Sequence, residues 1–241
     1  MKAAGLKVCV RRIEYDMKVY LKRAAAIVLP VILTVGLAAI ILFSAVPSCS
    51  GKFDFSATFY YVCYDSPTDS QSAASVSAVV HSYGGAGYIV ESDGKYFVTI
   101  SCYYNESDAD GVCKALSNKG LSCVVLEAGR SKISLPLSAR GKAEVYKGTL
   151  STLRSISEVC YALANGMDEG RHNQTSAKSV LGEVKTGLES LLRANGTNCF
   201  FQELSKLIAE CDDVSQGYVF SYDVRRLQIA VCDSIIHVRL Y

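Results

Sequence analysis

The sequence has few of the residues that build catalytic and metal sites. It contains no Trp and only three His, and its ten Cys include no CxxC pair and no Cys/His cluster. A structural zinc site is therefore unsupported, because such sites draw Cys and His ligands from closely spaced pairs. His81, His172 and His237 fall in different predicted elements, and none has an acid or a nucleophile at a catalytic spacing. We predict no metal, no cofactor and no enzymatic activity.

Excess charge of either sign is also scarce over the chain as a whole. The formal net charge is only +2, which gives no electrostatic basis for nucleic-acid binding. The charges are unevenly distributed, because residues 1–23 carry seven Lys or Arg against two acids, a balance of +5, and residues 24–46 carry none. A basic head followed by an uncharged stretch is typical of a membrane protein.

Residues 24–46 form one long apolar run. Its 23 residues are enough to cross a ~30 Å hydrocarbon core at about 1.5 Å per residue. A cleaved signal peptide is the alternative, but its apolar core spans roughly 7–15 residues behind a shorter basic lead. We favour a retained helix in the lipid bilayer. The positive-inside rule places residues 1–23 in the cytoplasm and the body after Val46 outside, which predicts a single-pass protein of the cell membrane.

Nine of the ten cysteines follow this apolar run. An odd number does not suit a fully paired disulfide framework, and such frameworks are usual in much smaller secreted domains. Most of these cysteines fall at positions that also suit a core. We therefore expect them to be small buried hydrophobic residues.

Residues 57–128, after a short tether at 47–56, alternate strands and helices in the order β-α-β-β-α-β. Turn and cap residues delimit each element. The elements are a strand at 58–64, a helix capped by Thr68 or Asp69 and ended at Gly84–Gly85, a hairpin at 88–103 that turns at 92–94, a helix capped by Asn105 and stopped at Gly120, and a strand at 121–126. Split βαβ units of this order form a four-stranded antiparallel sheet with both helices on one face. The predicted fold is therefore α+β and ferredoxin-like, with the other sheet face open for binding.

The third strand and the helix after it carry a more specific pattern. Its residues are Tyr96, Val98, Ile100, Ser101, Tyr103, Asp108 and Ala109, preceded by the segment 85–91 and the turn at Gly94. This segment resembles the SPOR domain, the sporulation-related repeat of bacterial envelope and division proteins. The resemblance implies binding of peptidoglycan glycan strands, particularly strands stripped of stem peptides, across the open sheet face. Aromatic platforms with polar groups beside them suit sugars.

The resemblance assigns the glycan site to strand residues on that open face. Where the family has an aromatic residue followed two positions later by arginine, this chain has Lys95 and Phe97. Strand alternation places Thr99, Ser101 and Tyr103 on the same face, a pattern that also fits a plain solvated surface. The predicted glycan-binding residues are Lys95, Phe97, Thr99 and Ser101, with Tyr60 from the first strand. The first strand departs from the family, because residues 60–63 lack its glutamine and the glycine two positions later.

After a connector at 129–140, residues 141–241 are helical in period. Four apolar stripes at helical spacing are separated by short turns, the first closed by Gly166 and the second by Asn195–Gly196. Such stripes predict an antiparallel helical bundle. They are most simply the core of that bundle, and the alternative is that a share of them docks an envelope protein or a second copy of the chain.

Two functions are consistent with these features. The first is a membrane-anchored protein that binds denuded peptidoglycan glycan at a division or sporulation septum. The second is a non-enzymatic protein-interaction module of a cell-envelope complex, in which the sheet has lost glycan binding. The missing glutamine and glycine favour the second function, and the rest of the SPOR resemblance favours the first. A sheet face covered by the C-terminal helices would exclude sugar binding there.

Overall fold

A computed structural model describes residues 52–53, 55–64, 69–92, 94–131, 133–135, 141–196 and 199–238. The predicted cytoplasmic tail at 1–23 and the predicted membrane helix at 24–46 lie outside these residues. Within the described part of the chain, no helix combines the length and the apolar character needed to cross a bilayer.

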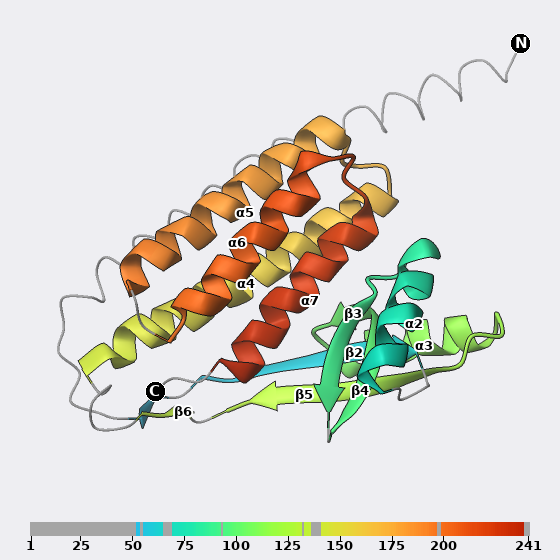
Figure 1. Cartoon of the computed structure of the whole chain (residues 1–241), viewed down its shortest axis with the longest axis horizontal. Coiled ribbons are helices and arrows are strands. Elements are labelled where there is room, and N and C mark those ends of the chain that lie inside the picture. Colours follow the sequence, from blue (N-terminus) through green and yellow to red (C-terminus); the bar gives the residue numbers. More distant parts are fainter. Residues whose placement is uncertain are drawn as a thin grey trace, which may run out of the picture.

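The central sheet has four strands, each antiparallel to its neighbours, as predicted. The strands are β2 (Ala57–Tyr64), β3 (Tyr88–Ser92), β4 (Lys95–Tyr103) and β5 (Cys123–Arg130), and they lie in the order β3-β4-β2-β5. Helix α2 (Ser70–Ser82) connects β2 to β3 and lies along β3 and β4, whereas α3 (Glu106–Ser117) connects β4 to β5 and lies along β2, β4 and β5 (Figure 1).

Local chemistry sets the ends of these elements. The carboxylate of Asp69, one of the two predicted caps, accepts hydrogen bonds from the backbone N–H groups of Gln71 and Ser72 at 3.0 and 2.9 Å. Asn105 caps α3 in the same way, because its side chain accepts from the backbone N–H of Asp108 at 2.8 Å. The β3–β4 hairpin turns through Gly94, whose φ of +71° favours glycine.

The C-terminal region is helical, as predicted. It contains α4 (Ala143–Asp168), α5 (Gln174–Asn195), α6 (Phe201–Gln216) and α7 (Ser221–His237). The prediction that Gly166 ends the first of these helices is wrong. Helix α4 continues through Gly166 to Asp168, and the chain turns at Gly170, where φ is +69°. Gly166 is instead a point of close approach, since a Cβ added there would overlap the ring of His172.

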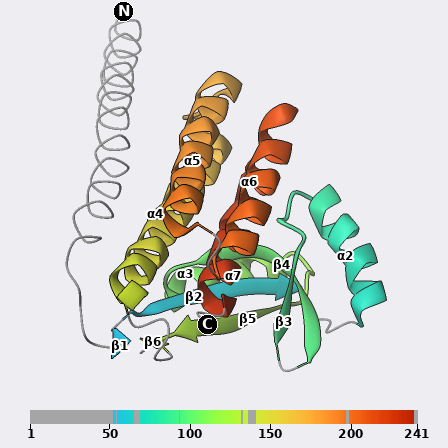
Figure 2. The ribbon, with the colours of Figure 1, turned by 60° about the vertical axis from the view of Figure 1, so that its left-hand side comes forward.

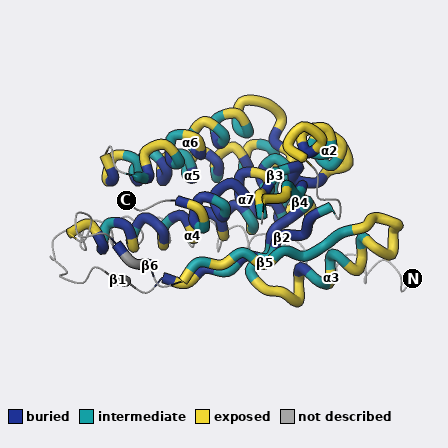
Figure 3. Tube along the Cα trace, turned by 60° about the horizontal axis from the view of Figure 1, so that its bottom comes forward, coloured by how far each residue is buried: buried dark blue, intermediate teal, exposed yellow. Residues whose placement is uncertain are grey.

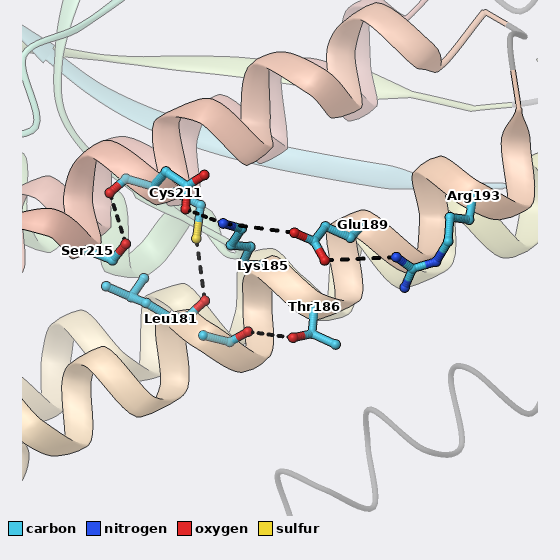
Figure 4. A network of polar contacts seen from close by, with 9 residues as sticks. Leu181, Lys185, Thr186, Glu189, Arg193, Cys211 and Ser215 are labelled. Atoms are coloured by element: carbon cyan, nitrogen blue, oxygen red, sulfur yellow. Dashed lines mark hydrogen bonds and ion pairs between the residues drawn. The ribbon is translucent and has the colours of Figure 1, made fainter.

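Helices α5 and α6 pack side by side and are joined by polar contacts at their surface (Figure 4). The ammonium of Lys185 donates to the carboxylate of Asp212 across the helix pair at 2.6 Å. Deeper in the contact, the thiol of Cys211 donates to the Leu181 carbonyl at 3.4 Å. The hydrogen bond to Asp212 raises the pKa of Lys185, so the ammonium stays charged at neutral pH.

Helix α7 lies between the other helices and the sheet. It contacts α4 and α6 on one side and all four strands of the central sheet on the other (Figures 1 and 2). Its buried residues point in every direction around the helix, and Figure 3 shows burial along most of its length: Val224, Leu227, Gln228, Ile229, Ala230, Val231, Cys232, Ser234 and Ile235. The prediction of an open sheet face is therefore wrong, because α7 covers the face opposite α2 and α3.

The segments expected to be a tether and a connector contain two short strands. Lys52–Phe53 form β1 and Ile133–Ser134 form β6, and the two pair as a small antiparallel sheet. Phe55 of the tether and Leu135 of the connector are buried in the same core as the helices. The ends of the residue 57–128 unit are thereby held against the C-terminal helices.

Candidate functional site

The predicted glycan-binding residues do not share an open surface. Thr99 is fully buried, and its hydroxyl lies 3.7 Å from the thiol of Cys63. Phe97 is half-buried and packs against the main core. Ser101 is also buried, Tyr60 is half-buried, and Lys95 alone among the five is exposed, at the start of β4 beside the hairpin turn. The structure therefore leaves Lys95 as the one predicted glycan residue that is freely accessible.

A β-bulge explains why the strand alternation fails. Cys63 pairs with Thr99, but Val62 pairs with Ser101, so Ile100 is an extra residue on β4. Thr99 consequently lies on the same face as Cys63, whereas Ser101 lies on the opposite face with Val62. The prediction that residues 95, 97, 99, 101 and 103 share one face is wrong beyond the bulge.

The face that carries Phe97 and Thr99 is held against α7 by specific polar contacts. Tyr88, the cross-strand neighbour of Thr99, donates its hydroxyl to the Asp233 carboxylate of α7 at 3.1 Å. The side-chain amide of Gln228 donates to the Cys102 carbonyl of β4 at 3.2 Å. Burial, with the neighbouring Asp233 carboxylate, raises the pKa of Tyr88, which keeps this hydroxyl protonated as a donor. These two hydrogen bonds link α7 to β3 and to β4.

Exposed apolar side chains gather instead at one end of α2 and at the turn between α6 and α7. We name the three rings at the turn, Tyr218, Phe220 and Tyr222, the aromatic patch. Among the described residues only six large hydrophobic side chains are strongly exposed, and four of them lie at these two places: Tyr83 at 87%, Tyr218 at 65%, Val79 at 54% and Phe220 at 43%. Large exposed apolar residues that cluster in this way mark interaction sites more often than single ones do.

The rings of the patch are ordered by contact with one another. Phe220 and Tyr222 are stacked with centroids 5.0 Å apart and planes 7° apart, and Tyr218 leans on Phe220 at 4.8 Å. Tyr222 meets the ring of His81, from α2, edge to face at 4.6 Å. His81 in turn pairs with Asp223 of α7, with 2.9 Å between its Nε2 and the carboxylate Oδ1. The patch is therefore fixed at the junction of α2 and α7.

The turn that presents the rings is clamped from α5. The side chain of Gln174 donates to the carbonyl of Val219 at 2.7 Å and accepts from its N–H at 2.8 Å. Val219 is fully buried, and alternate residues of an extended segment point to opposite sides. The clamp consequently directs Tyr218 and Phe220 toward solvent.

Sequence reasoning missed the aromatic patch, although a signal for it exists. Tyr218, Phe220 and Tyr222 alternate with Val219 and Ser221 between two helical stripes, a pattern that places three rings on one side of an extended turn. The exposed residues of α2 carry no comparable signal, because Val79 follows the helical period expected of core residues and is nevertheless 54% exposed.

The described residues contain no group of three or more His, Cys, Asp or Glu side chains that could hold a metal ion. Comparisons with protein-family models, with curated proteins and with solved structures find no match for this chain. The resemblance to the SPOR family therefore stays a prediction, supported only by the residues quoted for it.

Proposed function

We propose that this chain is a non-enzymatic protein-interaction module of a membrane-anchored cell-envelope complex, and that it docks its partner through the aromatic patch. The anchor is the apolar run at 24–46, which places the body outside the cytoplasm. In this proposal the SPOR-type sheet serves as a scaffold and has lost glycan binding at its face.

One observation carries the proposal: α7 occupies the sheet face on which the SPOR resemblance places the glycan. A sugar chain could reach Thr99 only if α7 left the sheet. Helix α7 is buried on both sides, and its Val231, Cys232 and Ile235 are fully buried. Burying such side chains contributes about 1.5–3 kcal/mol each, so detaching the helix would cost more than the binding of a short sugar supplies.

The geometry of the aromatic patch favours a protein partner over a sugar. Sugars stack on the open faces of aromatic rings, but one face of Phe220 is covered by Tyr222 and Tyr218 leans against it. The stack presents ring edges and hydroxyl groups. Tyrosine and other aromatic anchors of this kind are enriched where proteins bind one another.

Photo-crosslinking in the source cells tests the proposal. A photoreactive residue in place of Tyr218, in the full chain, should give one discrete protein adduct. Phe220→Ala in the same chain should reduce that adduct about tenfold or more, because truncation of a central aromatic anchor costs at least about 1–2 kcal/mol of binding. A matched control is Phe201→Ala, since Phe201 is 44% exposed against 43% for Phe220 and lies at the other end of α6, about 24 Å away. An adduct that is insensitive to Phe220→Ala would overturn the docking surface.

Pelleting with peptidoglycan sacculi tests the loss of glycan binding. The full chain in mild detergent should stay in the supernatant with intact sacculi and with sacculi whose stem peptides have been removed by an amidase. Co-pelleting that increases on denuded glycan and is lost in Lys95→Ala would restore the predicted sheet site. Co-pelleting lost in Tyr218→Ala would make the aromatic patch a sugar site instead, and either result refutes the protein-docking proposal.

A further inference from the structure

Cys113 on α3 and Cys123 on β5 lie next to each other, on the side of the sheet opposite α7. The thiol of Cys113 on α3 donates to the carbonyl of Cys123 on β5 at 3.2 Å, and the thiol of Cys123 donates to the carbonyl of Cys113 at 3.1 Å. Each sulfur therefore lies against the backbone of the other residue. These reciprocal contacts place the two side chains next to each other between α3 and β5, and a disulfide needs two neighbouring cysteines.

This pair also differs from most of the other described cysteines in access to solvent. Cys63, Cys102, Cys160, Cys211 and Cys232 are buried, whereas Cys113 and Cys123, like Cys199, are partly exposed. Cys102 and Cys232 provide an internal comparison, because they are neighbours across the contact between β4 and α7 but are 1% and 0% exposed. Thiol–disulfide exchange needs an accessible thiol, so proximity alone does not make the buried pair reactive.

We propose that Cys113 and Cys123 form a redox-modification site that closes to an intramolecular disulfide on reaction with an oxidant of the disulfide class, such as oxidised glutathione. The thiolate of one cysteine attacks a sulfur of the oxidant, forms a mixed disulfide and releases one reduced thiol. The second cysteine, as its thiolate, then attacks the mixed disulfide and releases the second thiol. Two electrons pass from the cysteine pair to the oxidant, and the two cysteine protons end on the two released thiols.

The bond would join α3 to an edge strand of the sheet. Strand β5 is paired only with β2 in the central sheet, and the residues between the cysteines form the end of α3 and the turn through Gly120. Closing this loop restricts the unfolded chain more than the folded one, since the two residues are already in contact in the fold. Disulfides persist outside the cytoplasm and are rare within it. The inference does not depend on the aromatic patch, and the state of the pair in cells also reports on which side of the membrane the body lies.

The test uses the full chain, purified in detergent under reducing conditions and then incubated with oxidised glutathione. Alkylation and peptide mapping by mass spectrometry should find a peptide in which Cys113 is linked to Cys123. The thermal midpoint should rise by about 5–10 °C. Cys113→Ser and Cys123→Ser should each abolish both changes, and Cys199→Ser, which alters another partly exposed cysteine, should abolish neither.

Three results would overturn the proposal. They are the absence of the linked peptide from the oxidised wild-type chain, a linked peptide without any rise in the thermal midpoint, and oxidation that joins other cysteines while Cys113 and Cys123 stay reduced. The peptide map of the wild-type chain decides the first and third, so the test does not depend on the stability of any variant. The photo-crosslinking experiment at position 218 is a separate measurement. The absence of an adduct there would leave the disulfide result unaffected.

Discussion

At the scale of single residues, Gly166 shows how a close contact overrides helix propensity. It lies inside α4, where alanine is favoured over glycine by about 0.5–1 kcal/mol. A Cβ at this position would overlap the His172 ring, whose Nε2 lies 3.0 Å from it. We expect Gly166→Ala to lower the free energy of unfolding by about 1–3 kcal/mol, measured by urea denaturation.

Gly182 is the matched control for that substitution. It lies inside α5, and an added Cβ would have nothing within 4 Å. Gly182→Ala should therefore raise the free energy of unfolding by about 0.5–1 kcal/mol. Equal stabilisation by both substitutions would show that the His172 ring moves aside without cost.

Two histidines should make opposite contributions to the pH dependence of stability. Burial, with the positive charge of Arg171, lowers the pKa of His172. Its contribution is present above the ordinary pKa of about 6.5 and is lost as the pH falls through the lowered value. The hydrogen bond to Asp233 raises the pKa of His237. That contribution is complete below about pH 6.5 and is lost as the pH rises through the raised value.

Thermal midpoints between about pH 5 and 8 separate the two histidines. His172→Gln should remove part of the loss of stability on the acid side, and His237→Gln should remove part of the loss toward neutral pH. A His172→Gln profile parallel to that of the wild-type chain would contradict the role given to burial.

At the scale of helices and strands, the residues near each end of an element predicted where it begins and ends, but not which other elements pack against it. Asp69, Asn105 and Gly94 act within a few residues of themselves, so caps and turns follow from the sequence. The bulge at Ile100 does not follow from the sequence. The residues on either side of it alternate equally well with and without an extra residue in the strand. Only pairing with β2 reveals the extra residue, and with it the failure of the predicted glycan face beyond Thr99.

The position of α7 was open to prediction in part. Its stripe of Val224, Leu227, Val231 and Ile235 indicates one buried side, but Ile229, Ala230 and Cys232 add apolar residues outside that stripe. A helix with apolar residues beyond a single stripe is buried on more than one side. That pattern predicts a covered helix between two layers. Which surface covers it is long-range information, because the sheet lies about 100 residues earlier in the chain.

At the scale of the whole molecule, α7 packs against both the sheet and the other helices. We expect the sheet and the helices to unfold as one cooperative unit for this reason. The core that contains Tyr61 and Val90 of the sheet is continuous with that of Leu150 and Leu188 in the helices. Domains that share a core unfold together, whereas separate cores allow one to open alone. We expect native-state hydrogen exchange to give the same highest opening free energy for amides in β2, α4 and α7.

Ile229→Ala tests that cooperativity, because Ile229 is fully buried on α7 and its truncation should cost about 2–5 kcal/mol. The slowest amides of β2 and of α4 should lose this same amount, since both layers depend on the helix. Ile208→Ala, at a half-buried position on α6, should give a smaller loss that is again equal in the two layers. A loss confined to α4 would show that the sheet holds its fold without α7. The sheet face would then be exposable, and glycan binding there would again be a tenable function.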